Sequence, residues 1–149
     1  MPKPLTAPAL STKTIETNFT RADLEFLGVD HSGSSYEGRV YVNNPDADDS
    51  TARLASAGYA GSYHIFGHGG CLGDAGHCDV KPLRAYDPRA GHPLSRARKV
   101  VIATDVLREA LAGDEVTVTI VPVIHSVGPN SGYDDDIVAL EAVRIVTYR

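Results

Sequence analysis

The sequence predicts a mainly β protein, an antiparallel sandwich or jelly-roll-like fold with one short helix and a long Gly/His/Cys loop. Six or more segments show the two-residue alternation that is typical of strands, and a helical pattern occurs only once. Strands and helices do not alternate along the chain, which argues against a parallel α/β sheet. A chain of 149 residues with 42% hydrophobic content can bury a core without a disulfide or a structural metal.

The first twenty residues differ from the rest of the chain. Residues 1–20 are rich in Thr, Pro and Ala and show no hydrophobic period, which predicts a flexible N-terminal arm. Residues 21–149 are predicted to form a single β-sandwich domain. The arm lacks the basic start and apolar stretch of a secretory signal, and no apolar run approaches the ~18–20 residues that span a bilayer. We therefore expect a cytoplasmic chain, or one exported with a partner, either whole or cut from a longer protein.

The first two strands follow the arm directly. Residues 21–29 alternate between apolar and polar side chains, and turn residues come after them. Residues 35–43 predict the second strand, in which Gly38 marks a bulge or a close approach of another group to the backbone. One face of this strand is predicted to carry Tyr36, Val40 and Val42.

A third strand is predicted at residues 59–66, before glycines interrupt the alternation. Residues 67–97 show no sustained period. A stretch of about thirty such residues inside one domain is unusual and favours a functional loop. A short β-branched strand over residues 98–103 follows it.

The only predicted helix covers residues 104–111. Thr104 is expected to be its N-cap, with Asp105 in the first turn and Gly113 after its end. The next strand, residues 115–123, alternates a valine and isoleucine face with a threonine-rich face. The last strand is predicted from about residue 137 to 148, and a change of face near Ala142 indicates a bulge.

Histidine and cysteine are concentrated in one short segment. Three of the six histidines and both cysteines lie within residues 64–78. They are His64, His68, Cys71, His77 and Cys78. On a strand His64 and His68 would share a face with Phe66, and the glycines that follow would let the cysteines fold back toward them. Because imidazole and thiolate ligands suit zinc or copper, and thiolate favours Cu(I), these five residues are the predicted metal ligands.

Two other interpretations of this segment remain open. Cys71 and Cys78 could form a disulfide that closes a tight loop, and the histidines could be ordered by hydrogen bonds alone. His31 and His92 lie in turn-like sequence, which favours a surface role. His125 follows the strand at residues 115–123 and could reach the same end of the sandwich.

Several function classes are disfavoured by composition and motifs. The formal net charge of −5 repels phosphate backbones, so nucleic acid is not an expected partner. Because no apolar run is long enough to span a bilayer, a membrane is not an expected partner either. The phosphate-binding loop, the dinucleotide fingerprint and the serine nucleophile elbow are all missing from the sequence. No catalytic residue can therefore be assigned from a motif.

Five collinear segments resemble a known family. They are Val40-Tyr41-Val42-Asn43, then residues 58–63 leading to His68, residues 102–107, residues 116–122, and residues 143–148. In this order they resemble the C-terminal β-domain of plant polyphenol oxidases and tyrosinases, named for its Lys-Phe-Asp-Val start, and especially the versions attached to bacterial tyrosinase-family proteins. Here Glu37-Gly38-Arg39 stands where Lys-Phe-Asp would precede Val40, and the Gly/His/Cys segment from Gly67 is an addition.

The resemblance implies a module that packs against a type-3 dicopper oxidase domain and covers its entrance. It implies that Tyr63 and Phe66 contact the mouth of the partner's site, and the His/Cys loop could hand over copper. The oxidase itself needs six histidines placed on a helical bundle. This chain has no predicted helical bundle, so an enzyme is not the first expectation. The alternatives are a small enzyme with one copper ion, or an interaction domain without metal whose loop is closed by a disulfide.

Overall fold

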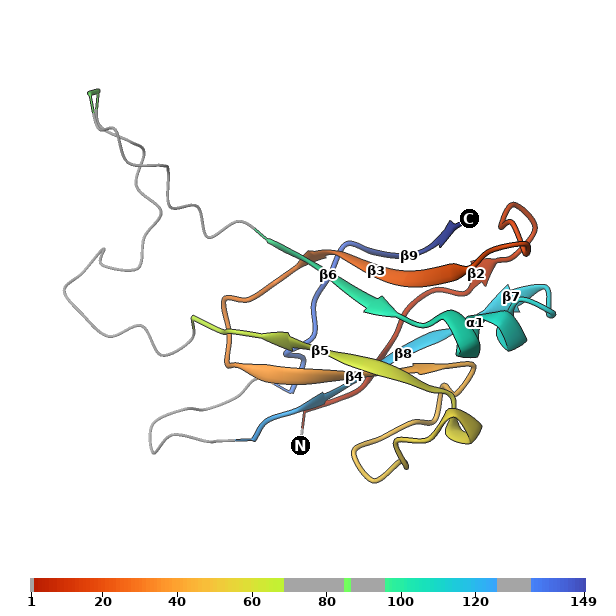
Figure 1. Ribbon diagram of the computed structural model, residues 1–149. Helices are drawn as coiled ribbons and strands as arrows, with labels where there is room; N and C mark the ends of the chain where they lie inside the picture. Colours follow the sequence, from red (N-terminus) through yellow and green to blue (C-terminus); the bar gives the residue numbers. More distant parts are fainter. Residues whose placement is uncertain (1, 69–84, 87–95, 126–134) are drawn as a thin grey trace.

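The computed structural model describes residues 2–68, 85–86, 96–125 and 135–149 (Figure 1). Within these residues the chain forms mostly antiparallel strands and one α-helix, which confirms the predicted all-β fold class. A four-stranded sheet has the order β1 (Leu5–Thr6), β8 (Val118–Val123), β4 (Tyr36–Val42) and β5 (Tyr59–Ile65). A three-stranded sheet has the order β6 (Ala97–Ile102), β3 (Arg21–Val29) and β9 (Ala142–Tyr148). The short strands β2 (Leu10–Ser11) and β7 (Glu115–Val116) pair with each other.

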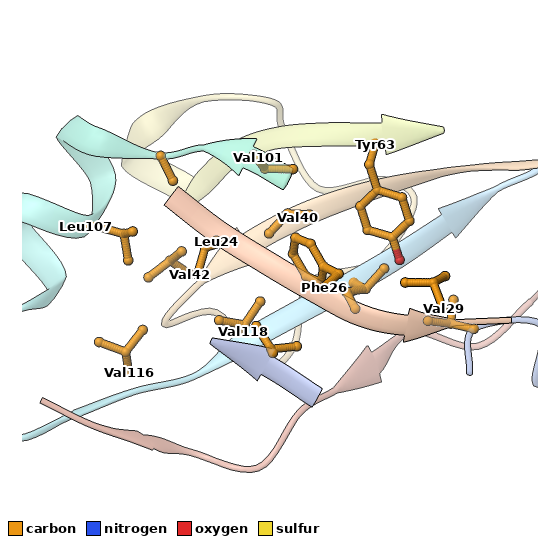
Figure 2. Packing of buried hydrophobic residues seen from close by; sticks show 14 of the residues in the cluster. Leu24, Phe26, Val29, Val40, Val42, Tyr63, Val101, Leu107, Val116 and Val118 are labelled. Atoms are coloured by element: carbon orange, nitrogen blue, oxygen red, sulfur yellow. The ribbon is translucent and has the colours of Figure 1, made fainter. Parts of the chain in front are cut away.

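The core lies between the two larger sheets, where the inward side chains of their strands meet (Figure 2). Leu24 and Phe26 of β3 and Val40 of β4 are completely buried, and Leu107 of the helix closes one end. The face predicted for β4 is confirmed, because Tyr36, Val40 and Val42 all belong to this cluster. A smaller apolar cluster lies on the outer face of the four-stranded sheet, where Ala47 packs against Tyr41 and Val121.

The N-terminal residues are not an arm. Leu5 and Thr6 pair with Ile120 and Thr119 of β8, and β2 pairs with β7. Phe19 is buried in the main core. The prediction of a separate arm over residues 1–20 is therefore wrong for the described part of that segment. Strands of two residues carry no detectable period, so nothing in the local sequence could indicate them.

The helix α1 (Thr104–Ala110) forms where it is predicted, but its cap differs. Ala103 is the N-cap residue, and no side chain caps the helix. Thr104 is instead the first helical residue, and its hydroxyl accepts a hydrogen bond from the backbone N–H of Ala22 at 3.2 Å. The prediction of Thr104 as the N-cap is wrong, because its side chain joins the helix to β3.

The last strand is shorter than predicted. β9 begins at Ala142 and pairs in continuous register with β3 as far as Tyr148. The change of face near Ala142 is thus the start of the strand rather than a bulge. Glu141, which precedes it, still donates its backbone N–H to the carbonyl of Leu27 at 2.9 Å. Among the described residues, no helix is long and apolar enough to cross a membrane.

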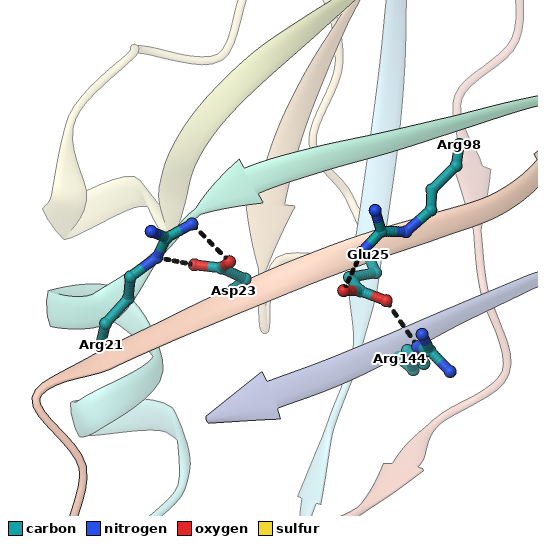
Figure 3. Close-up of polar contacts among 5 residues, drawn as sticks. All are labelled: Arg21, Asp23, Glu25, Arg98 and Arg144. Carbon is teal, nitrogen blue, oxygen red and sulfur yellow. Dashed lines mark hydrogen bonds and ion pairs between the residues drawn. The ribbon is translucent and has the colours of Figure 1, made fainter. Parts of the chain in front are cut away.

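Two buried carboxylates stabilise the outer face of the three-stranded sheet (Figure 3). Asp23 accepts two hydrogen bonds from Arg21, at 2.8 and 2.7 Å. Glu25, only 2% exposed, is held by Arg98 on β6 and by Arg144 on β9, whose Nε lies 2.6 Å from Oε2. The Arg21–Asp23 pair lies within β3, whereas the two ion pairs of Glu25 connect β3 to β6 and to β9.

These contacts make stability depend on pH. The donors of Arg144 and Arg98 hold the pKa of Glu25 below its ordinary value of 4.5. Since the folded protein favours the ionised form, this contribution is complete above pH 4.5 and disappears as the pH falls through the lowered pKa. We expect Glu25→Gln to be less stable than the wild type at pH 7 and the difference to shrink at about pH 3. Urea unfolding at both pH values, with the exposed-site variant Glu109→Gln as control, measures this. A constant difference would contradict it.

Candidate functional site

One end of the sandwich brings together histidines that are far apart in the sequence. At this end β3, β5 and β8 finish and β4 begins (Figure 1). His31 follows β3, His68 follows β5 and His125 follows β8. The antiparallel pairing of β4 with both β5 and β8 places these three segments at one edge. We call this edge the histidine end.

The backbones around His31 and His68 are locked together. The N–H of His68 donates to the carbonyl of His31 at 2.9 Å, and the N–H of Gly67 donates to the Ser35 hydroxyl at 3.0 Å. Gly67 is required here, because a Cβ at this position would lie 2.2 Å from the carbonyl oxygen of Gly33. The two segments are therefore held in contact by a backbone hydrogen bond and by the Ser35 hydroxyl, without any contribution from the two imidazoles.

The His31 and His68 imidazoles face each other across this contact. Their Nδ1 atoms are 2.9 Å apart, and their ring centroids are 4.8 Å apart with the planes tilted by 58°. His68 is exposed and His31 is half-buried. Between the neutral rings one Nδ1 must carry a proton and the other must accept it, because two protonated nitrogens would point their hydrogens at each other.

A carboxylate lies beside this pair. Asp30 accepts a hydrogen bond from the backbone N–H of Ser32 at 2.8 Å, which lowers the pKa of the Asp30 carboxyl. Electrostatic interactions with Arg96 and His31 act in the same direction. Asp30 is therefore anionic at neutral pH and makes its surroundings more favourable to a cation.

His125 is held by a buried glutamate. Its Nε2 lies 2.7 Å from Oε2 of Glu37, which is only 4% exposed on the outer face of β4. Burial alone would raise the pKa of Glu37, but the hydrogen bond from His125 and the charges of Arg39 and Arg53 outweigh it and lower the pKa. The result is an oriented imidazole whose other nitrogen is left for a further contact.

The two predicted partner contacts have opposite exposures. Phe66 is 86% exposed, next to the Gly67–His68 contact with the turn after β3. Tyr63 is only 4% exposed, and its ring packs against Phe26 with centroids 4.9 Å apart. The prediction that Tyr63 contacts a partner is wrong, because the alternation of β5 points this side chain into the core. Gly38 leaves room for it, since a Cβ there would lie 2.7 Å from Cζ of Tyr63.

The two buried tyrosines of the core form an edge-on pair. The rings of Tyr36 and Tyr63 have centroids 6.2 Å apart. Their hydroxyls interact with each other but make no hydrogen bond of good geometry to the rest of the described chain, and burial raises the pKa of both phenols. Both groups are therefore neutral at physiological pH and act as core side chains.

The predicted metal ligands are only partly visible. His64 is exposed on the outer face of β5, where it pairs in register with Glu37, whereas His68 contacts His31. His64 and His68 therefore have different partners. Cys71, His77 and Cys78, together with His92, lie outside the described residues. In the described part of the chain, no three His, Cys, Asp or Glu side chains converge to hold a metal.

A hollow lies at the opposite end of the sandwich from the histidines. Its volume is about 430 Å³, and it lies between residues 42–44, residues 55–58 and α1. The residues that line it include one carboxylate, Glu109, and neither histidine nor cysteine. It therefore offers no set of groups for metal binding or acid–base chemistry.

Sequence reasoning missed the part played by His31 and Glu37. His31 lies in a turn sequence that is typical of the surface, and its partner is 37 residues further along the chain. One signal could have found it: antiparallel pairing of the second and third strands returns the end of β5 to the turn before β4. Glu37 sits on a strand face that is ordinarily solvated, so its burial could not be foreseen.

No protein-family model matches the chain, and no curated protein is significantly similar to it.

Proposed function

We propose that this chain is a β-sandwich module that accompanies a type-3 copper oxidase of the tyrosinase class, shielding its entrance or helping it to mature. The proposal starts from the five segments that resemble the polyphenol oxidase C-terminal domain. These segments contribute to β4, β5, β8 and β9 and to the junction of β6 with α1. They therefore include strands from both larger sheets.

The observation that carries the proposal is the exposed Phe66 at the histidine end. An aromatic side chain that is 86% exposed gains free energy when a partner covers it, and aromatic residues commonly dominate binding at interfaces. Its backbone neighbours are fixed by the hydrogen bonds of Gly67 and His68, so the position of Phe66 is defined before binding. Such a projecting ring suits the mouth of a phenol-binding site.

The histidine end carries side chains of a type that ligates copper. The notable pair is His31 and His68, and imidazole nitrogen is a good ligand for copper. His64, Cys71, His77 and Cys78 remain proposed donors, of which His64 lies on the outer face of β5. Copper held here would supply the metal that the oxidase needs, and the chain's own residues would bind it and release it.

The test uses this chain and a tyrosinase-type oxidase from the same organism. We expect the wild-type chain to bind the oxidase and to change its copper content or its turnover of a phenolic substrate. Phe66→Ser should weaken binding by roughly thirtyfold or more, as for a central aromatic contact. Leu54→Ser, which changes another exposed apolar residue at the far end of β5, is the matched control and should have no effect.

Two results would contradict the proposal. One is a wild-type chain that neither binds the oxidase nor alters its copper loading or activity. The other is stoichiometric copper with oxidase turnover in the isolated chain, which would favour a small copper enzyme instead. If neither interaction nor metal is found and Cys71 is joined to Cys78, a structural interaction domain becomes the better description.

A further inference from the structure

We infer that His31 and His68 form a two-imidazole site that binds one soft or borderline metal cation, Cu(I) or Zn(II), through their Nδ1 atoms. His31 is not among the ligands that the sequence predicts, and it replaces His64 as the partner of His68. The inference concerns the metal chemistry of this chain alone. It does not depend on whether the chain docks on an oxidase.

The first argument is that the backbone sets the approach of the two rings. His68 N–H donates to the His31 carbonyl at 2.9 Å, and Gly67 fits only because it has no side chain. Two long side chains that meet by chance on a surface lose conformational freedom when they bind a ligand together. Here much of that cost is already met by folding, which is the condition for a preorganised site.

The second argument is the separation of the two Nδ1 atoms. The Nδ1 atoms lie 2.9 Å apart, so the gap has room for one proton at a time. A zinc ion with nitrogen ligands at about 2.0–2.1 Å in a tetrahedral arrangement separates two of them by roughly 3.3 Å. A metal can therefore take the place of the shared proton if the Nδ1 atoms move apart by about 0.4 Å and the rings turn so that both lone pairs point at it.

The third argument is the charge and access of the site. Asp30 lies close enough to interact electrostatically with His31, and its negative charge favours a cation. The exposure of His68 leaves a route for the metal and open coordination positions for water or for a donor from a partner protein. Two imidazoles on separate chain segments, with one of them exposed, suit a site from which a metal can be passed on.

The experiment titrates the purified full chain with Cu(I), without oxygen and against a coloured chelator, and separately with Zn(II). His31→Asn and His68→Asn keep a polar side chain at each position. We expect each substitution to lower the metal affinity at least about tenfold. Replacing a residue that only hydrogen-bonds to a metal ligand already has an effect of this size, so replacing a ligand should have at least as large an effect. His125→Asn is the matched control, and we expect it to bind as the wild type does.

A second measurement separates this site from one built on the cysteines. The same titrations are repeated with Cys71→Ser and Cys78→Ser together, where binding should persist and should still require His31 and His68. Imidazole nitrogen NMR should show the Nδ1 signals of both rings shifting on metal addition, and amide spectra should confirm that every variant is folded. The inference is overturned if His31→Asn and His68→Asn bind as the wild type does, or if no metal binds once the cysteines are replaced. Either result leaves the docking experiment with Phe66 unaffected.

Discussion

Replacing Phe26 with alanine is expected to destabilise the protein by about 3–5 kcal/mol, as usual for deleting a buried aromatic ring. Phe26 is fully buried between the two sheets, and its ring packs on that of Tyr63. The deletion removes apolar contacts and leaves a cavity that neighbouring strands can fill only in part. Urea unfolding followed by circular dichroism measures the change.

The matched control removes the same ring from the surface. Phe66→Ala should change the free energy of unfolding by less than about 0.5 kcal/mol, because the Phe66 side chain is 86% exposed. If Phe26→Ala does not fold, Phe26→Leu provides a smaller deletion in the same place. Equal unfolding midpoints for the Phe26 and Phe66 alanine variants would show that the core is misplaced.

Gly58→Ala is expected to cost about 2 kcal/mol or more, because two effects combine at this residue. Gly58 has a φ of +84°, a conformation that L side chains rarely adopt. A Cβ there would also lie 2.3 Å from the carbonyl oxygen of Val42, on a strand that cannot move away without breaking its pairing. The start of β5 should therefore distort, and the unfolding midpoint in urea should fall.

Gly113→Ala is the control for this substitution. Its φ lies outside the left-handed region, and a Cβ there would meet nothing closer than 3.7 Å. We expect it to be neutral or to stabilise the protein by a few tenths of a kcal/mol to about 1 kcal/mol, through a less flexible unfolded chain. If both alanine variants unfold at the same urea concentration, the strain assigned to Gly58 is absent.

The fold could be predicted from the sequence where alternation extended over several residues. Residues 21–29 have a buried face and ion-paired carboxylates on the other, and this pattern located β3 at its observed bounds. The pairing of Leu5 and Leu10 could not be predicted, because it depends on which strand edges lie nearby. Thr104 was misjudged for a related reason, since its hydroxyl serves a neighbouring strand rather than its own helix.

The candidate site was predicted less well than the fold. The sequence drew attention to His68, but its observed partner, His31, depends on the path of the chain between the sheets. Tyr63 was assigned to the surface because a hairpin pattern does not say which face is the inner one. The space that receives its ring is created by Gly38 on the neighbouring strand β4, where the sequence indicated a bulge or a close approach but not that Tyr63 is the group that approaches.

The N-terminal strand β1 also determines which backbone groups the edge of the four-stranded sheet exposes. Without β1, the β-branched strand β8 would form the sheet's edge and present unpaired N–H and C=O groups to any extended chain. Leu5 and Thr6 occupy that edge, and the N–H of Ala7 donates to the carbonyl of Val118 at 2.9 Å. Residues 5–7 thus occupy this stretch of the β8 edge from within the chain, so an added strand would have to displace them before it could pair there.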